Sequence, residues 1–288
     1  MHLTKTGKKI MMILFLIPFM YLIVWRILPM LYTLYLSFTD YNMIWDDQPI
    51  FVGLKTFETV LLDRDFLYSV WLSILFALIA VSVQYAIALV QALVVDSVIR
   101  YRNLLIGVLI LPMIVAPSVV GIIWYILYNN RIGAVNYLLS FLGIPAQTWL
   151  TDASTSFLSL IIADTWQWTP FVFLLLISSL QTIPHSLYEA ARVDGANWWQ
   201  ITCCIKLPMI KMVSITTILL RFMDAFREFD KVFIMTGGGP SNSTELSTMF
   251  VYKAAFQSFN IGQASAMAII LLLIISLLYM IFLKFTSI

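Results

Sequence analysis

Long apolar segments alternate with short polar ones along the 288 residues of the chain. An α-helix rises about 1.5 Å per residue, so a hydrocarbon core of about 30 Å requires about 20 apolar residues for one crossing. Six segments of the sequence reach that length. The pattern therefore predicts six transmembrane helices, at residues 10–38, 68–95, 104–128, 156–180, 208–235 and 264–285.

Composition supports this interpretation and excludes several classes of protein. Apolar residues make up 61% of the chain and charged residues 11%, against about 45–50% and 25% in soluble domains. A net charge of +2 is too small to indicate a nucleic-acid partner. The two cysteines, Cys203 and Cys204, are neighbours with no histidine nearby, so they predict neither a disulfide framework nor a metal site. The expected fold class is an all-α polytopic membrane protein.

The basic residues predict the orientation of the chain in the bilayer, because cytoplasmic loops carry an excess of lysine and arginine. With the N-terminus inside, the cytoplasmic segments hold Lys5, Lys8, Lys9, Arg100, Arg102, Arg192, Lys206, Lys211 and Lys284. The first outer loop is instead rich in aspartate and glutamate. We therefore expect both termini in the cytoplasm, with 1–9 as a cytoplasmic N-terminus and 10–285 as the membrane domain.

The cytoplasmic loop at 181–208 has signals of ordered structure. Ser186 and Glu189 have the spacing of a capping box, which predicts the start of a helix. Gly195 can adopt the left-handed conformation that ends a helix, and Asn197 can cap a second short helix beginning at Trp198. The loop is therefore expected to form a helix-turn-helix projection from the membrane domain.

The same loop resembles a known motif. Glu189-Ala190-Ala191, then Gly195, Ile205 and Leu207-Pro208 are spaced as in the EAA loop of bacterial ABC importer permeases. The resemblance implies a type I ABC importer permease fold and a loop that docks on an ATP-binding subunit. It assigns the coupling surface to Tyr188, Glu189, Ala190, Ala191, Asp194 and Gly195. The alternative is an amphipathic interfacial helix that has no partner.

Two further segments resemble the carbohydrate-uptake branch of these permeases. They are Phe-Asp-Lys-Val-Phe-Ile-Met-Thr-Gly-Gly-Gly-Pro at 229–240 and Trp-Gln-Trp-Thr-Pro-Phe at 166–171. The similarity is to the larger, maltose-type partner of the two membrane subunits. It implies residence in the bacterial inner membrane and four kinds of partner: the lipid bilayer, a second homologous permease subunit, two ATP-binding subunits and an extracytoplasmic solute-binding protein. The chain contains no Walker A motif, so ATP and Mg are expected in the partner subunits and no cofactor in this chain.

Eleven residues of the fifth predicted span, 221–231, contain six ionisable side chains: Arg221, Asp224, Arg227, Glu228, Asp230 and Lys231. Each costs about 2.5–3.5 kcal/mol at the centre of a lipid-exposed helix, so these side chains are expected to face protein or water. One face of a continuous helix would hold Arg221, Asp224, Ala225 and Glu228, and an adjoining face Arg227, Asp230 and Lys231. Internal salt bridges that hold the helices together are one interpretation.

A solute pathway is the other interpretation of these charges. The fourth span adds Asp164, Gln167, Trp168 and Phe171 at the same helical spacing. Carboxylates, amides and arginine bind sugar hydroxyls, and an aromatic ring stacks on the apolar face of a sugar. The resemblance to the maltose-type permease places its sugar-contacting positions on these two faces. The implied pathway residues are Asp164, Gln167, Trp168, Phe171, Arg221, Asp224, Ala225 and Glu228.

These features predict half of the membrane pathway of an ATP-driven importer for a sugar, polyol or glycerol-type solute. A proton-coupled secondary transporter of a polar solute is the alternative, although such proteins commonly show an internal repeat and none is found here. A membrane enzyme would need a nucleophile and base, or a metal-ligand spacing, that the sequence does not contain. The chain is therefore not expected to be an enzyme.

Overall fold

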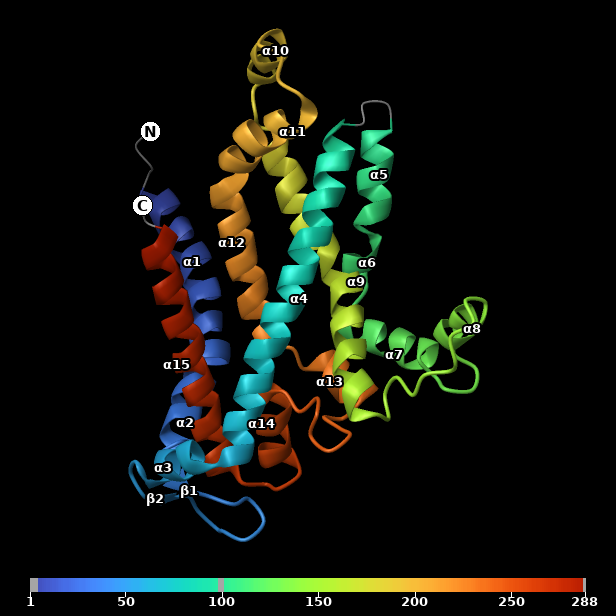
Figure 1. Cartoon of the computed structure of the whole chain (residues 1–288). Helices are drawn as coiled ribbons and strands as arrows, with labels where there is room; N and C mark the ends of the chain where they lie inside the picture. The colour runs from blue at the N-terminus through green and yellow to red at the C-terminus, as the bar shows by residue number, and fades with distance from the viewer. Residues whose placement is uncertain (1–4, 98–100, 287–288) are drawn as a thin grey trace. The chain divides into compact units, whose positions relative to one another are not determined.

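The computed structural model describes residues 5–97 and 101–286, and its regular structure is almost entirely helical (Figure 1). Arg100 and the first residues of the predicted N-terminal segment lie outside the described residues. The elements are α1 (Lys5–Leu22), a π-helical turn (Ile23–Ile27), α2 (Leu28–Leu36), β1 (Thr39–Asp40), β2 (Ile50–Phe51), α3 (Lys55–Leu62), α4 (Arg64–Ser97), α5 (Arg102–Leu109), α6 (Leu111–Ile114), α7 (Pro117–Leu127), α8 (Ala134–Ser140), α9 (Ala153–Leu180), α10 (His185–Val193), α11 (Trp198–Ile201), a second π-helical turn (Thr202–Lys206), α12 (Leu207–Phe226), α13 (Asp230–Met235), α14 (Ser247–Phe256) and α15 (Ile261–Thr286).

Within the described residues, five helical segments are long and apolar enough to cross a membrane. They are Leu14–Leu36, Arg64–Ser97, Ala153–Leu180, Trp198–Phe226 and Ile261–Phe282. These segments correspond to the first, second, fourth, fifth and sixth predicted spans. The predicted all-α membrane class is therefore confirmed, and the third span has a different construction.

The third predicted span is broken into α5, α6 and α7, and α7 has only 11 residues. The break falls at Val115 and Ala116, whose ψ angles of 132° and 139° are extended. Pro117 causes it, because a proline ring disfavours the helical conformation of the residue before it. The break leaves the Val115 carbonyl without a helical donor, so another element can supply one.

The fifth predicted span also differs from a single helix over 208–235. It begins earlier, at Trp198, and runs through the second π-helical turn into α12, which ends at Phe226. After a three-residue connection the chain re-forms as the short helix α13. The expected continuous face from Arg221 to Glu228, and its neighbour at 227–231, are therefore wrong as helix faces.

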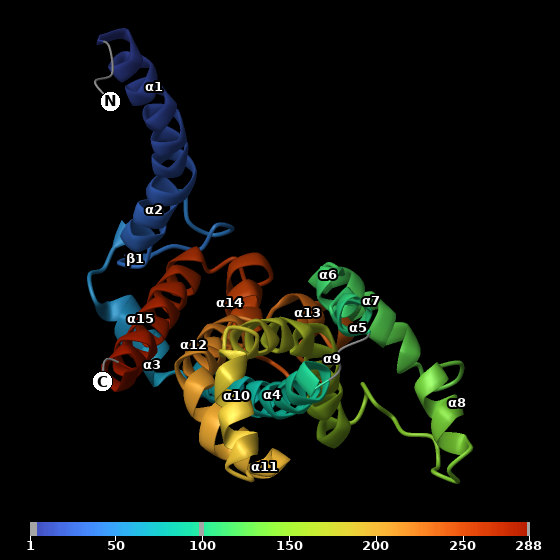
Figure 2. The same cartoon turned by 90° about the horizontal axis from the view of Figure 1, so that it is seen from above.

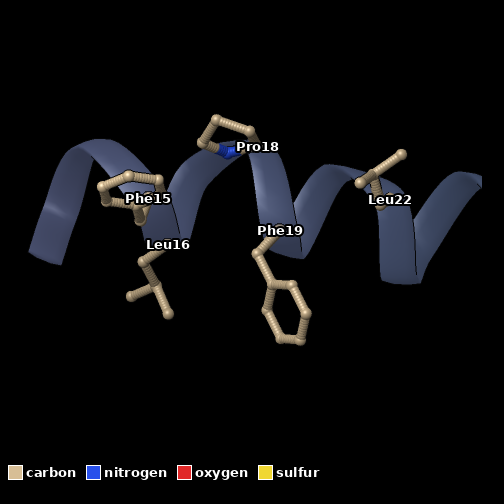
Figure 3. Close-up of a pocket in the computed structure, with 5 residues that line it drawn as sticks. All are labelled: Phe15, Leu16, Pro18, Phe19 and Leu22. Atoms are coloured by element: carbon tan, nitrogen blue, oxygen red, sulfur yellow. The ribbon is translucent and has the colours of Figure 1, made fainter.

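The described residues of Met1–Arg64 and Val251–Ile274 form one compact unit, called here the first unit. Its α1, π-helical turn and α2 make a continuous helix whose side chains from Leu14 to Leu34 are almost all exposed or half-exposed. A shallow apolar groove of about 430 Å³ lies on α1, where Leu16 and Phe19 extend from the same side of the helix (Figure 3). The hairpin of β1 and β2 pairs Thr39 with Phe51, an element that the sequence did not predict.

The described residues of Asp65–Phe250 and Ile275–Ile288 form the second unit, which contains the candidate sites. Figure 2 shows α4, α9 and α12 next to one another in this unit. Ala88 and Ala92, one helical turn apart on α4, are fully buried in this unit. The apolar core at one end of these helices consists of Ala88, Ala92, Leu93, Val95, Val172, Phe173, Leu176, Ile177, Leu180, Ile183 and Ile210.

Candidate functional site

The predicted projection is present as α10, but its N-terminal cap is not the expected one. The helix begins at His185 after Pro184, which has a φ of −58° and provides no side-chain cap. Ser186 therefore lies inside the first turn, and the predicted Ser186–Glu189 capping box is wrong. Proline fixes its own φ near the helical value, so the chain can enter the helix directly after Pro184.

The C-terminal end of α10 and the next helix form as the sequence predicts. Gly195 has a φ of +81°, and its N–H donates to the Arg192 carbonyl at 3.1 Å, while the Ala196 N–H donates to the Ala191 carbonyl at 2.9 Å. This is the hydrogen-bond pattern of a Schellman motif. Asn197 and Gln200 then form a reciprocal capping box at the start of α11.

Most of the predicted coupling surface is open. Figure 1 shows α10 beyond the ends of α9 and α12 in the second unit. Glu189, Ala190, Asp194 and Gly195 are exposed, and Ala191 is half-buried. Tyr188 is half-buried and turns toward the helices below it, with the Lys206 Nζ 5.4 Å from its ring centroid. Five of the six predicted residues thus form a surface that another subunit can contact.

A second group of predicted residues meets at Asp164, in the middle of α9. Its side chain is fully buried. The Oδ2 atom of Asp164 accepts hydrogen bonds from Arg221 Nη2 at 2.6 Å and from Gln84 Nε2 at 2.7 Å. Arg221 Nε also donates to Gln84 Oε1 at 3.0 Å. Three helices, α4, α9 and α12, are therefore joined by one polar network.

Lys231 extends this network to α13 and to the broken third span. Its Nζ lies 3.2 Å from Asp164 Oδ1 and 2.7 Å from Glu228 Oε2, and it donates to Gln167 Oε1 at 3.0 Å. Gln167 Nε2 in turn donates to the Val115 carbonyl at 3.0 Å. The Gln167 side chain thus donates the hydrogen bond that the Val115 carbonyl lacks because the helix is broken before Pro117.

The buried part of the network is balanced in charge. Arg221 and Lys231 are opposed by Asp164 and Glu228, and all four are 9% exposed or less. Pairing of this kind is what allows ionisable groups inside a membrane protein, since an unpaired charge there is strongly destabilising. Of the two interpretations of the charges, the first applies to Asp164 and Glu228, because both form internal salt bridges.

Arg221 also connects this network to a partly exposed edge of the helices, formed by Asp224 and Trp168. Its Nη1 lies 2.8 Å from Asp224 Oδ2, and the Asp224 side chain is 50% exposed. Its Cζ lies 5.0 Å from the ring centroid of Trp168, which is half-buried and meets Phe171 edge to face at 6.3 Å. The remaining predicted pathway residue, Ala225, is fully buried on α12. The open edge therefore combines a carboxylate and an aromatic ring, both in contact with the buried guanidinium of Arg221.

Two members of the network were not among the predicted pathway residues. Gln84 is an amide inside an apolar span, and a polar side chain at that depth is itself a signal of function or of pairing. Lys231 lies on a different face of the expected continuous helix, because hydropathy does not indicate that the helix stops at Phe226. The end of α12 is what lets Lys231 approach Asp164.

The chain is similar to a known protein family over most of its length. A family model described as "Binding-protein-dependent transport system inner membrane component" matches residues 84–286. The trehalose/maltose transport system permease protein MalF of Thermococcus litoralis is 34% identical over 265 residues, which cover 91% of this chain and 88% of the relative. The sn-glycerol-3-phosphate transport system permease protein UgpA of Agrobacterium fabrum is 32% identical, over 78% of this chain and 77% of the relative.

A comparison with solved structures gives the same fold. A subunit of a bacterial ABC transporter involved in the import of the acidic polysaccharide alginate superposes with a TM-score of 0.82. The match covers 96% of each chain at 19% sequence identity. A second structure, of a bacterial alginate ABC transporter in complex with alginate pentasaccharide-bound periplasmic protein, has a TM-score of 0.84 and covers 96% of this chain and 94% of the other.

Proposed function

Since the chain belongs to the family of binding-protein-dependent transport system inner membrane components, and is thus a membrane subunit of an ABC importer rather than an enzyme, we propose that it forms half of a pathway for a neutral polyhydroxylated solute. The relatives include permeases named for trehalose and maltose. The solute class expected here is a sugar, a polyol or a glycerol-type compound.

The edge beside Arg221 carries the proposal for the solute class. A carboxylate that is half exposed, Asp224, accepts hydrogen bonds from hydroxyl groups, and Trp168 offers a ring face for the apolar side of a sugar. Arg221 contacts both of them, so it fixes them relative to each other. Its single positive charge is opposed by two carboxylates, Asp164 and Asp224, so an anionic solute would meet a net negative charge there. A neutral solute fits this edge better than a phosphate or uronate.

The remaining pathway residues are assigned supporting roles. Asp164, Gln167 and Glu228 hold Arg221 and Lys231 in place from buried positions. Phe171 packs against Trp168, and Ala225 provides close packing on α12. In this proposal only Asp224 and Trp168 touch the solute, and the buried Arg221 and the other residues position them.

The importer is proposed to act with a second homologous permease, two ATP-binding subunits that hold ATP and Mg, and an extracytoplasmic solute-binding protein. The exposed residues of α10 and Gly195 are the proposed docking surface for the ATP-binding subunit. We also propose that both termini lie on the cytoplasmic side of the inner membrane, a proposal that the distribution of basic residues supports.

The proposal is tested with the assembled complex in proteoliposomes, with the solute-binding protein and a panel of maltose, trehalose, glycerol and sn-glycerol-3-phosphate. We expect ATP-dependent uptake of a neutral member of the panel. Asp224→Asn should lower uptake per assembled complex by about tenfold, because a hydrogen bond to a charged group contributes about 1.5–3 kcal/mol. Trp168→Ala should lower it by about twofold to tenfold, because it removes a stacking contact of about 0.5–1.5 kcal/mol. Leu175→Ala, two helical turns along α9 from Trp168 and beside residues of α12, is the control for a general loss of packing.

Two outcomes would contradict the proposal. Uptake driven by a proton gradient without ATP would favour the secondary transporter. Selective uptake of the phosphate ester, increased by Asp224→Asn, would show that the edge takes an anion.

A further inference from the structure

A second buried ion pair lies at the base of α10, away from the network around Asp164. Asp96 is in the last turn of α4, and its Oδ2 atom lies 2.6 Å from the Nζ of Lys206. The side chains are 11% and 8% exposed, so water competes little for either charge. The two residues are 110 positions apart in the sequence. The pair therefore joins the end of α4 to the helix that follows the α10 projection.

Lys206 reaches this position from a special point of its helix. It is the last residue of the π-helical turn Thr202–Lys206, which connects α11 to α12. A π-helical turn inserts extra backbone and rotates the residues that follow, and such turns are frequent at functional sites. Pro208, which has no N–H to donate, follows two residues later. The turn thus accommodates the proline and directs Lys206 inward.

The lysine of this pair also contacts α10 itself. Its Nζ lies 5.4 Å from the ring centroid of Tyr188, within the range of a cation–π interaction. Tyr188 packs against the apolar core that includes Leu93, Leu180 and Ile183. Burial raises the pKa of the Tyr188 phenol, and the negative charge of the nearby Asp96 raises it further.

Asp96 has a further contact across the connection between α4 and α5. Arg102 Nη2 donates to the main-chain carbonyl of Asp96 at 2.8 Å and lies 3.9 Å from its carboxylate. Arg102 is the first residue of α5. The one residue Asp96 is therefore in contact with the start of α5 and, through Lys206, with α10 and α12.

We propose that Asp96 is a positioning residue that, through Lys206 and Tyr188, transmits movements of α10 to α4 and α5. The inference rests on the proposed docking of α10 on an ATP-binding subunit. Short connections in the chain already join α10 to α9 and α12. The Lys206–Asp96 pair adds α4 and α5 to the same moving body. Because α4 also carries Gln84, a displacement of α4 reaches the network around Asp164 and Arg221.

The test measures solute moved per ATP hydrolysed in proteoliposomes that contain the complete complex. Asp96→Asn and Lys206→Met should each lower this ratio by about threefold to thirtyfold, the usual range for residues that carry coupling between sites. The double variant should be no worse than either single one, because both changes remove the same contact. Lys211→Met removes an exposed lysine from the same helix and should leave the ratio unchanged.

A purely structural role predicts a different result. Assembly and thermal stability would fall, but the assembled fraction would keep the wild-type ratio, and this outcome would overturn the inference. If the single variants fail to assemble, the reversed pair Asp96→Lys with Lys206→Asp provides the test. A wild-type ratio in the reversed pair supports the inference, and an assembled but uncoupled reversed pair overturns it.

The same experiment separates this inference from the proposed function. If the wild-type chain neither assembles with an ATP-binding subunit nor transports a solute, the proposed function fails. If the wild-type complex is coupled and the Asp96 and Lys206 variants are equally coupled, only the inference about Asp96 fails.

Discussion

The buried network makes opposite predictions for two aspartates that both contact Arg221. Asp164 is fully buried and is also in contact with Lys231, whereas the Asp224 side chain is half exposed. Asp164→Asn keeps the shape of the side chain but removes the charge between two buried cations. Asp224→Asn removes a charge that water already screens.

The expected loss of stability in each variant follows from the burial of the side chain. Removing one partner of a buried ion pair costs about 3–5 kcal/mol, because the other charge stays buried without compensation. Glu228 still lies 2.7 Å from Lys231, so the lower part of that range is expected for Asp164→Asn. A partly exposed pair contributes about 1 kcal/mol or less, which is the expectation for Asp224→Asn.

The assay is thermal unfolding of the purified complex in one detergent, with uptake measured on the same preparations. A destabilisation of 1 kcal/mol lowers Tm by about 2–4 °C for 150–250 residues. Asp164→Asn should therefore lower Tm by about 6–12 °C, and Asp224→Asn by about 4 °C or less while lowering uptake. Equal Tm values for the two variants, or a stable Asp164→Asn complex with reduced uptake alone, would refute the assignment of Asp164 to structure.

Three further predictions concern single positions. Gly195→Val should reduce ATP-coupled uptake without changing membrane insertion, because a φ of +81° costs a β-branched residue about 1–2 kcal/mol. Gly195→Asn is the control, because asparagine tolerates that conformation and should retain uptake. Equal uptake in the two variants would contradict the reasoning. Gly262→Ala should destabilise the first unit by about 1–3 kcal/mol, since the new Cβ would meet the Thr39 carbonyl, and unchanged proteolysis of the β1–β2 hairpin would argue against this. Asp152 caps α9, and hydrogen bonds from Ser154 hold its pKa below the usual value. A lowered folded-state pKa stabilises the protein above the unfolded pKa of about 4, and this stabilisation is lost as the pH falls. The Tm of the wild-type protein should therefore exceed that of Asp152→Asn by less at pH 3 than at pH 6.

The sequence determined the membrane class, the location of most helices and the family. Runs of apolar residues long enough to cross a bilayer are a local property, so five of the predicted spans correspond to helices of the structure. The end of α10 at Gly195 and the capping box at Asn197 are also local, since each depends on residues within one turn. The spacing from Glu189 to Pro208 identified the EAA loop for the same reason.

The tertiary structure decided where helices stop and which charges meet. Hydropathy does not distinguish a straight span from one broken at Val115 or Phe226, because both keep apolar residues in the bilayer. The break at Phe226 moved Lys231 from a predicted helix face into contact with Asp164, and it separated Glu228 from the face of Arg221. Gln84 and Asp96 gained their roles only when α4 packed beside α9 and α12. Pairing of buried charges depends on side chains brought together from distant parts of the chain, and a periodic pattern along one helix carries no information about those partners.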